Sequence, residues 1–409
     1  MTKPVNLPSS RMGLFNKILS TLKGMKVASD TPLLFIFWGS RGSGKTTFLN
    51  TVKKELSAIS DVEVLGFWDA KNITAADLSY SIKETIGNKN SKIKLIFIDN
   101  LDALLKDTSG TELFDFESNT LLPLIQRGDV VIVTGSQIEI NLWQEYDIRV
   151  KQENHQLIPL KMDEIEEILH GTNIDKERAE EITFGHPKIL ELFLSNPDWA
   201  EKEASYYANE YFLNDLSTET KELTQTASIF PVFDIFILRK IKGDDQEHPS
   251  DMLTWYNDQI NELTQRWIVQ FDAQVGAYRF TDDAVRRLIS RNYQVTSSTK
   301  FIRIHQIAAE YYQEEAKNTS YLAQLFVSAI YHIAQSQSKN KDKPGTICLR
   351  WVKDMQNKWF GANWEQVLNA WESGSGNDTV KEEIILLIGS KYHSKITELL
   401  SENKIKSEV

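Results

Sequence analysis

The residues best suited to chemistry form one glycine-rich run, Gly39-Ser40-Arg41-Gly42-Ser43-Gly44-Lys45-Thr46. Its spacing fits G-x-x-x-x-G-K-[ST] at every position. The glycines let the backbone bend so that successive N–H groups point inward, and the positive end of a following helix adds to the attraction for a phosphate. Lys45 is expected to reach the β- and γ-phosphates and Thr46 to place its hydroxyl on Mg²⁺. The run, with Thr47 after it, predicts a phosphate-binding loop.

A second motif is acidic. The apolar residues 95–98 end in Asp99, and a phosphate loop needs a carboxylate at a neighbouring strand tip to hold the Mg²⁺ water shell. Asp99 is predicted to fill that role. Asp102, three residues further on, either orients or deprotonates an attacking water or is a surface residue in the first turn of a helix, and both interpretations stay open.

Further polar groups follow the apolar residues 130–133, which run into Thr134-Gly135-Ser136. Thr134 or Ser136 is a candidate sensor of the γ-phosphate, although a simple strand-to-loop transition explains the pattern equally well. Arg149 lies shortly before another predicted strand, where an arginine finger can sit. A solvated surface charge is the alternative for this residue.

The elements that must position these groups alternate between strand and helix patterns. Strands are predicted at residues 33–38, 62–68, 95–98 and 130–133, with a weaker fifth at 157–160. Because helical patterns lie between most of them, a mostly parallel sheet covered on both faces is expected. The fold class predicted for residues 1–160 is therefore an α/β P-loop NTPase domain of AAA+-like architecture that binds nucleotide.

The rest of the chain is predicted to be largely helical. Residues 161–215 are expected to form a helical lid subdomain, interrupted at Gly185-His186-Pro187. In residues 216–295, helices at 218–227, 233–241 and 251–265 precede two short strands at 268–271 and 278–280, which is the outline of a winged helix. Residues 296–409 are expected to form an α-helical C-terminal domain.

Together these motifs resemble a family, the signalling STAND ATPases of the AAA+-related group, which includes NB-ARC and NACHT proteins. The residues that carry the resemblance are Asp99-Asn100-Leu101-Asp102, Thr134-Gly135-Ser136 and Gly185-His186-Pro187-Lys188-Ile189-Leu190. The resemblance covers roughly residues 1–335. It implies ATP or ADP with Mg²⁺ as ligands, Pro187 against the adenine, and Gly185 permitting a tight approach. A helix break by glycine and proline would look the same.

The chain departs from this pattern at several points. The usual base in the AAA+ class is a glutamate directly after the Mg²⁺ aspartate, whereas this chain has Asn100, which favours weak hydrolysis. Many relatives carry a His-Asp pair near the last wing strand, but residues 279–283 read Arg-Phe-Thr-Asp-Asp. Only about 30 residues precede the loop strand, so a protein partner is expected to supply input, output or both.

Composition bounds the class of protein. Among 409 residues, 41% are hydrophobic and 25% charged, which is ordinary for a soluble globular chain. The single cysteine, Cys348, allows no intramolecular disulfide, and no apolar run approaches the roughly 20 residues of a membrane span, so a cytoplasmic protein is predicted. The net charge of −11 argues mildly against a protein whose main task is coating nucleic acid.

Three functions remain in competition. The favoured one is a switch for signalling or defence in bacteria, in which ATP/ADP exchange or slow hydrolysis controls domain arrangement and homo-oligomerisation. The alternative is a winged-helix ATPase acting on DNA, of origin-recognition or transposition-helper type. Residues 251–262, the expected recognition helix, contain three acids and no base, which disfavours DNA. A nucleotide-gated scaffold without hydrolysis is also open.

Overall fold

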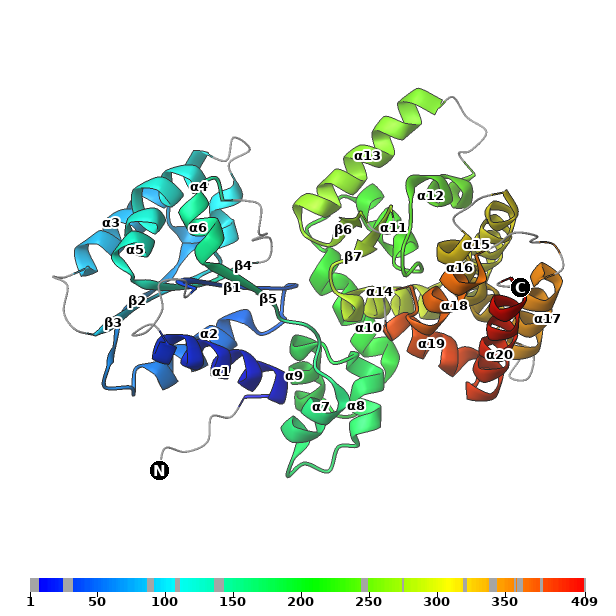
Figure 1. The fold of residues 1–409 in the computed structure, drawn as a ribbon, viewed down its shortest axis with the longest axis horizontal. Coiled ribbons are helices and arrows are strands. Elements are labelled where there is room, and N and C mark those ends of the chain that lie inside the picture. Colours follow the sequence, from blue (N-terminus) through cyan, green and yellow to red (C-terminus); the bar gives the residue numbers. More distant parts are fainter. Residues whose placement is uncertain are drawn as a thin grey trace. The chain divides into compact units, whose positions relative to one another are not determined.

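The computed structural model describes residues 7–24, 32–86, 92–106, 111–135, 143–243, 249–273, 276–318, 322–337, 344–356, 358, 363–375 and 378–407. The chain divides into two compact units, Met1–Ala204 and Ser205–Val409, which are taken in turn (Figure 1). None of the described helices has the length and apolarity that crossing a bilayer requires.

The first unit is built on a five-stranded parallel sheet in the order β2-β3-β4-β1-β5. Four of the strands were predicted from apolar runs and are confirmed: β1 (Leu34–Trp38), β2 (Val62–Asp69), β3 (Ile93–Asp99) and β4 (Val130–Gly135). The side chains of β1 and β4 are almost wholly buried, as expected for strands covered on both faces. All carboxyl ends therefore meet at one edge of the sheet.

The fifth strand was predicted at residues 157–160, and this is wrong. β5 is Gln152–Gln156, whose side chains are all polar and half-buried. An edge strand pairs on one side only, here with β1, and needs no apolar run to hold its place. His155 stacks on Phe37 with ring centroids 5.4 Å apart, and burial lowers the pKa of this histidine. Leu157 follows the strand, and its N–H donates to the Trp38 carbonyl at 2.7 Å.

Helices cover both faces of this sheet (Figure 1). One face carries α1 (Ser9–Gly24) and α2 (Lys45–Leu56). The other carries α3 (Ala75–Thr85), α4 (Thr111–Phe116), the π-helical η3 (Glu117–Leu121), α5 (Leu122–Arg127) and α6 (Tyr146–Lys151). Two 3₁₀ turns, η1 (Ala70–Asn72) and η2 (Leu101–Lys106), directly follow β2 and β3 at the edge where the strands end.

A small helical lid follows β5. It consists of α7 (Met162–Leu169), α8 (Lys176–Thr183) and α9 (Pro187–Ser195). Helix α1 ties this lid to the sheet, because the Ser10 N–H donates to Glu164 of α7 at 2.8 Å while Lys17 pairs with Glu153 of β5. The buried Arg11 donates to the Ile158 carbonyl at 2.6 Å, in the segment that joins sheet and lid.

The second unit opens with a winged helix. After α10 (Glu201–Leu213), which begins in the first unit, come α11 (Thr218–Ala227), α12 (Ile235–Lys242), α13 (Pro249–Gln265), β6 (Val269–Asp272), β7 (Ala277–Phe280) and α14 (Asp283–Thr296). β6 and β7 are antiparallel, and Phe233 forms a single bridge to Tyr278 on the far side of β7. Helices followed by a β-ribbon give the predicted winged-helix outline.

The winged helix shares its core with an extensive helical region. Its helices are α15 (Ser298–Asn318), α16 (Leu322–Ser336), α17 (Pro344–Gln356), α18 (Trp364–Glu372), α19 (Asp378–Ile388) and α20 (Ser390–Ser407). One hydrophobic cluster runs from α11 to α20 and includes Phe230, Tyr256, Phe326 and Trp371, all buried. In the C-terminal region, Trp351, Trp364 and Trp371 are therefore core residues.

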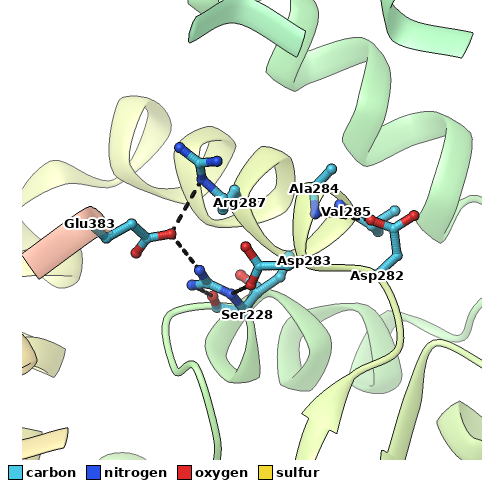
Figure 2. A network of polar contacts seen from close by, with 8 residues as sticks. Ser228, Asp282, Asp283, Ala284, Val285, Arg287 and Glu383 are labelled. Atoms are coloured by element: carbon cyan, nitrogen blue, oxygen red, sulfur yellow. Dashed lines mark hydrogen bonds and ion pairs between the residues drawn. The ribbon is translucent and has the colours of Figure 1, made fainter. Parts of the chain in front are cut away.

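A buried ion network fastens α14 to the C-terminal region (Figure 2). Arg286, with 1% of its side chain exposed, donates to Asp283 at 2.7 Å and to Glu383 of α19 at 2.6 Å. It also reaches the Ser228 carbonyl at 3.5 Å, and Arg287 pairs with the same Glu383 at 3.3 Å. Asp282 caps α14 by accepting from the Ala284 and Val285 N–H groups.

Replacing the central cation of this network tests its weight. Arg286→Ala leaves two half-buried carboxylates without their shared partner, and we expect a loss of about 3 kcal/mol in the free energy of unfolding, the lower end of the range for breaking a buried ion pair. Arg287→Ala is the matched control, because this more exposed arginine is only a second partner of Glu383 and should cost about 1 kcal/mol or less. Urea denaturation measures both. Equal losses would show that Arg286 has no special structural weight.

Candidate functional site

The phosphate loop connects β1 to α2 at the carboxyl edge of the sheet. Gly42 has φ 82° and Gly44 has φ 89°, a left-handed backbone that glycine adopts without steric cost. Gly44 is the residue before the first turn of α2, so the free N–H groups of that turn face out of the sheet edge. The glycine spacing in the sequence therefore has a direct conformational cause.

Lys45 lies folded over this loop. Its side-chain ammonium donates to the Gly39 carbonyl at 2.8 Å and the Ser40 carbonyl at 2.9 Å, and the residue is 9% exposed. Phosphate oxygens are stronger acceptors for an ammonium than these neutral carbonyls. Lys45 can therefore exchange the two carbonyls for a phosphate that enters the loop. Arg41, Thr46 and Thr47 are exposed on the same loop and helix start.

Three strand and helix ends converge on Asp99. This carboxylate, 2% exposed, accepts from the Thr46 hydroxyl at 2.6 Å on one oxygen and from the Thr134 hydroxyl on the other. The Asn100 N–H donates to Thr134 at 3.2 Å and to Asp99 at 3.1 Å. The structure thus brings together residues from α2, β3 and β4 that were predicted separately. A hydroxyl beside a carboxylate is a hard oxygen donor pair that fits Mg²⁺, which keeps several water ligands.

The remaining predicted residues lie in different places. Asp102 is half-buried in η2, directly after Asp99 at the same edge. Arg149 is exposed on α6, beside the exposed side chains of Tyr146 and Val150. Arg149 also lies near Glu117, a buried carboxyl whose pKa is raised by burial and lowered in part by this arginine. Ser136 lies outside the described residues.

The Gly-His-Pro segment joins the lid to the loop. Gly185 has φ +69°, and a Cβ there would lie 2.0 Å from the Leu160 carbonyl oxygen, so its tight approach is to the chain itself. The Leu160 N–H donates to the Gly185 carbonyl at 2.8 Å. Pro187 is half-buried at the start of α9. The predicted contact of Pro187 with adenine stays a prediction.

Two polar contacts were missed from the sequence. His186, fully buried, has its Nε2 3.5 Å from the Ser40 hydroxyl of the phosphate loop. The Asn100 side chain donates to Asp69 at 2.8 Å across the tips of β3 and β2. A signal for the second was present, because the apolar pattern of β2 ends in Asp69 just as that of β3 ends in Asp99.

Comparison with known proteins agrees with this geometry. Residues 35–144 match the family model described as ATPase family associated with various cellular activities (AAA). This segment, which contains the phosphate loop, Asp99 and Thr134, is an AAA ATPase domain and thus a nucleotide-binding domain. No curated protein sequence matches the chain.

Three solved structures are similar to the chain at low sequence identity. A Walker-type ATPase of Pyrococcus abyssi is 15% identical with a TM-score of 0.46, over 68% of this chain and 95% of that one. The ORC2 protein of Aeropyrum pernix, in ADPNP–ADP complexes, is 15% identical with a TM-score of 0.43, over 71% and 96%. Drosophila ORC bound to DNA is 11% identical with a TM-score of 0.35, over 70% and 88%.

The lid contact can be tested at Gly185. In Gly185→Ala the new Cβ collides with the Leu160 carbonyl, so we expect a lower melting temperature and weaker ATP binding, because sheet and lid can no longer meet there. Gly171→Ala is the matched control: φ is +87° in the same lid but nothing lies within 4 Å of the added Cβ. It should show only the left-handed penalty of about 1–2 kcal/mol. Calorimetry measures the melting temperature and a nucleotide titration measures ATP affinity. Identical values for the two variants would contradict the steric argument.

Proposed function

We propose that the chain is a slow ATPase that works as a nucleotide-controlled switch. The observation that carries the proposal is the convergence of Thr46 and Thr134 on Asp99 beside the phosphate loop, with Asn100 in place of a carboxylate base. The groups that bind nucleotide and Mg²⁺ are therefore present, but the usual glutamate base is replaced by the neutral amide of Asn100. Such a site favours long occupancy by ATP over rapid turnover.

The roles of the binding groups follow from their chemistry. The loop N–H groups and Lys45 bind the β- and γ-phosphates, and Thr134 reads the γ-phosphate from the tip of β4. Thr46 and Asp99 would hold Mg²⁺, which neutralises phosphate charge when bound. Asp102, in the 3₁₀ turn after Asp99, is the carboxylate that the sequence offered for contacting the attacking water.

The switch rests on contacts between loop and lid. An entering phosphate draws Lys45 away from the Ser40 carbonyl, and the hydroxyl of the same Ser40 faces His186 of the lid. A bound nucleotide thereby acts on the contact between Ser40 and His186, which influences where the lid lies. A ligand that binds better to one position of the lid shifts the equilibrium between lid positions toward it. This is the mode of action that the STAND resemblance implies, with Pro187 on the adenine.

A second copy of the chain is the proposed partner of the ATP state. Tyr146 is 68% exposed and Val150 is 50% exposed, and both flank Arg149 on α6. Exposed aromatic and aliphatic groups around an arginine are typical of the centre of a protein interface. Arg149 would then stabilise phosphate charge in the neighbouring copy.

The switch proposal predicts a mass change. With a non-hydrolysable ATP analogue, light scattering after size exclusion should show a larger assembly than with ADP. Lys45→Ala should stay small in both because it loses the phosphate contact. Arg149→Ala should bind ATP normally and assemble less. A mass that ignores nucleotide in the wild type would remove self-assembly as the output, and failure to bind ATP would remove the proposal as a whole.

DNA is a second candidate partner because of the α13 surface. The exposed side chains of this helix include Asn257, Asn261 and Gln265, amides that can pair with adenine in a major groove. Glu262, one of the acids that disfavoured DNA, is half-buried and held by Thr220 at 2.7 Å and Arg266 at 3.1 Å. The acidic repulsion expected from the sequence is thus smaller. DNA handling also agrees with the origin-recognition proteins named above, though its support is the helix surface.

Fluorescence anisotropy on a random duplex at low salt, with ATP present, tests this candidate. If α13 enters the groove, Asp258→Asn should strengthen binding because it removes an exposed negative charge, and N257A/N261A/Q265A should weaken it. Binding should fall steeply as salt rises. Absence of binding at low salt, or binding that these variants leave unchanged, would exclude α13 as a DNA-reading helix.

A further inference from the structure

The tips of β2 and β3 lie side by side at the edge that carries the phosphate loop. Asp69 is in register with Asp99 in this parallel pair, and each is the last residue of its strand. Asp99 is engaged by two hydroxyls, whereas Asp69 is exposed. A second carboxylate, Asp69, thus lies next to Asp99, the proposed Mg²⁺ ligand, and is not itself a proposed ligand.

Asn100 occupies the position between these carboxylates. Its φ of 55° is left-handed, a conformation that asparagine tolerates better than most residues. The backbone N–H is spent on Asp99 and Thr134, and the side-chain nitrogen donates to Asp69 at 2.8 Å. Asp69 itself is held by the Lys71 N–H at 3.0 Å, as the cap of η1. The Asn100 amide therefore donates to a carboxylate that is itself held by a backbone hydrogen bond.

This partner decides which way the amide faces. An ionised carboxylate only accepts hydrogen bonds, so the NH₂ group of Asn100 must point to Asp69. The amide oxygen is then the end of the side chain that does not donate to Asp69, and it is an acceptor. Without the carboxylate, the amide could rotate by half a turn and exchange the positions of its oxygen and NH₂ group.

We infer that Asn100 orients the attacking water in ATP hydrolysis through its amide oxygen, and that Asp69 is the positioning residue that keeps this oxygen in place. The inference rests on the proposed ATPase function. A neutral amide is able to orient a water in phosphoryl transfer. It accepts a hydrogen bond but takes no proton, which accounts for slow turnover.

The step balances without a carboxylate base at position 100. The water oxygen forms a bond to the γ-phosphorus, the bond from that phosphorus to the bridging oxygen breaks, and ADP leaves with the electron pair. Both protons of the water end on the released phosphate, which leaves as dihydrogen phosphate. Asn100 is unchanged throughout.

The test compares variants of the pair in single-turnover hydrolysis alongside ATP binding. Asp69→Ala frees the amide and should lower the rate constant about tenfold, the effect of roughly one lost hydrogen bond, while ATP affinity stays unchanged. Asn100→Asp should also lower it, because two carboxylates then face each other. The exchanged pair D69N/N100D restores the contact with donor and acceptor reversed, and should recover the wild-type rate or exceed it. Asp77→Ala is the matched control, since this exposed aspartate also accepts a hydrogen bond at a helix start after β2, from the hydroxyl of the N-cap Thr74.

The outcomes separate the inference from the function it rests on. Wild-type protein that binds no ATP, or never hydrolyses it, overturns the proposed function. Normal wild-type hydrolysis with an unchanged rate in Asp69→Ala, or no recovery in D69N/N100D, overturns the inference alone. If only Asp102→Asn lowers the rate, the water is governed by Asp102.

Discussion

The site depends on one hydrogen-bonded carboxylate. Asp99 is buried at the tip of β3 and accepts hydrogen bonds from two hydroxyls, one on the helix that follows the phosphate loop and one on β4. This contact is possible because all five strands run parallel and end at the same edge. It fixes the loop helix against the sheet before any ligand arrives, so the cost of ordering the site is met by folding and not by binding. The contacts of Gly185 with Leu160 and of His186 with Ser40 then connect that edge to the lid.

The features that could be predicted from the sequence are those that a short stretch of residues encodes. The phosphate loop, the apolar strands and the winged helix all have short-range signatures, and Asp99 follows from the strand before it. The pairing of Asn100 with Asp69 has no such signature, because the residues are 31 positions apart and meet only through the register of β2 and β3. The orientation of Glu262 toward Thr220 is equally non-local. The position of β5 was predicted wrongly because an edge strand can be polar throughout and then has no apolar run to mark it.

The two units use polar groups in different ways. In the second unit Arg286 is enclosed by Asp283 and Glu383 and joins the winged helix to the C-terminal helices. Separating the helices would strand buried charges, so this unit should move as one body. In the first unit, the lid meets the phosphate loop through the long hydrogen bond between His186 and Ser40, while α1 holds the lid to the sheet through charge-assisted hydrogen bonds.

The polar edge strand has a consequence for how copies of this chain can meet. An open sheet exposes unpaired backbone groups at both edges, which invites strand-to-strand aggregation. Here one edge, β5, presents Gln, Glu, Asn and His, and the other, β2, is irregular in its pairing near Gly66. Neither edge offers a flat apolar ribbon as a template. The proposed association of ATP-loaded copies would then use helix surfaces and not sheet extension, which tends toward fibrils.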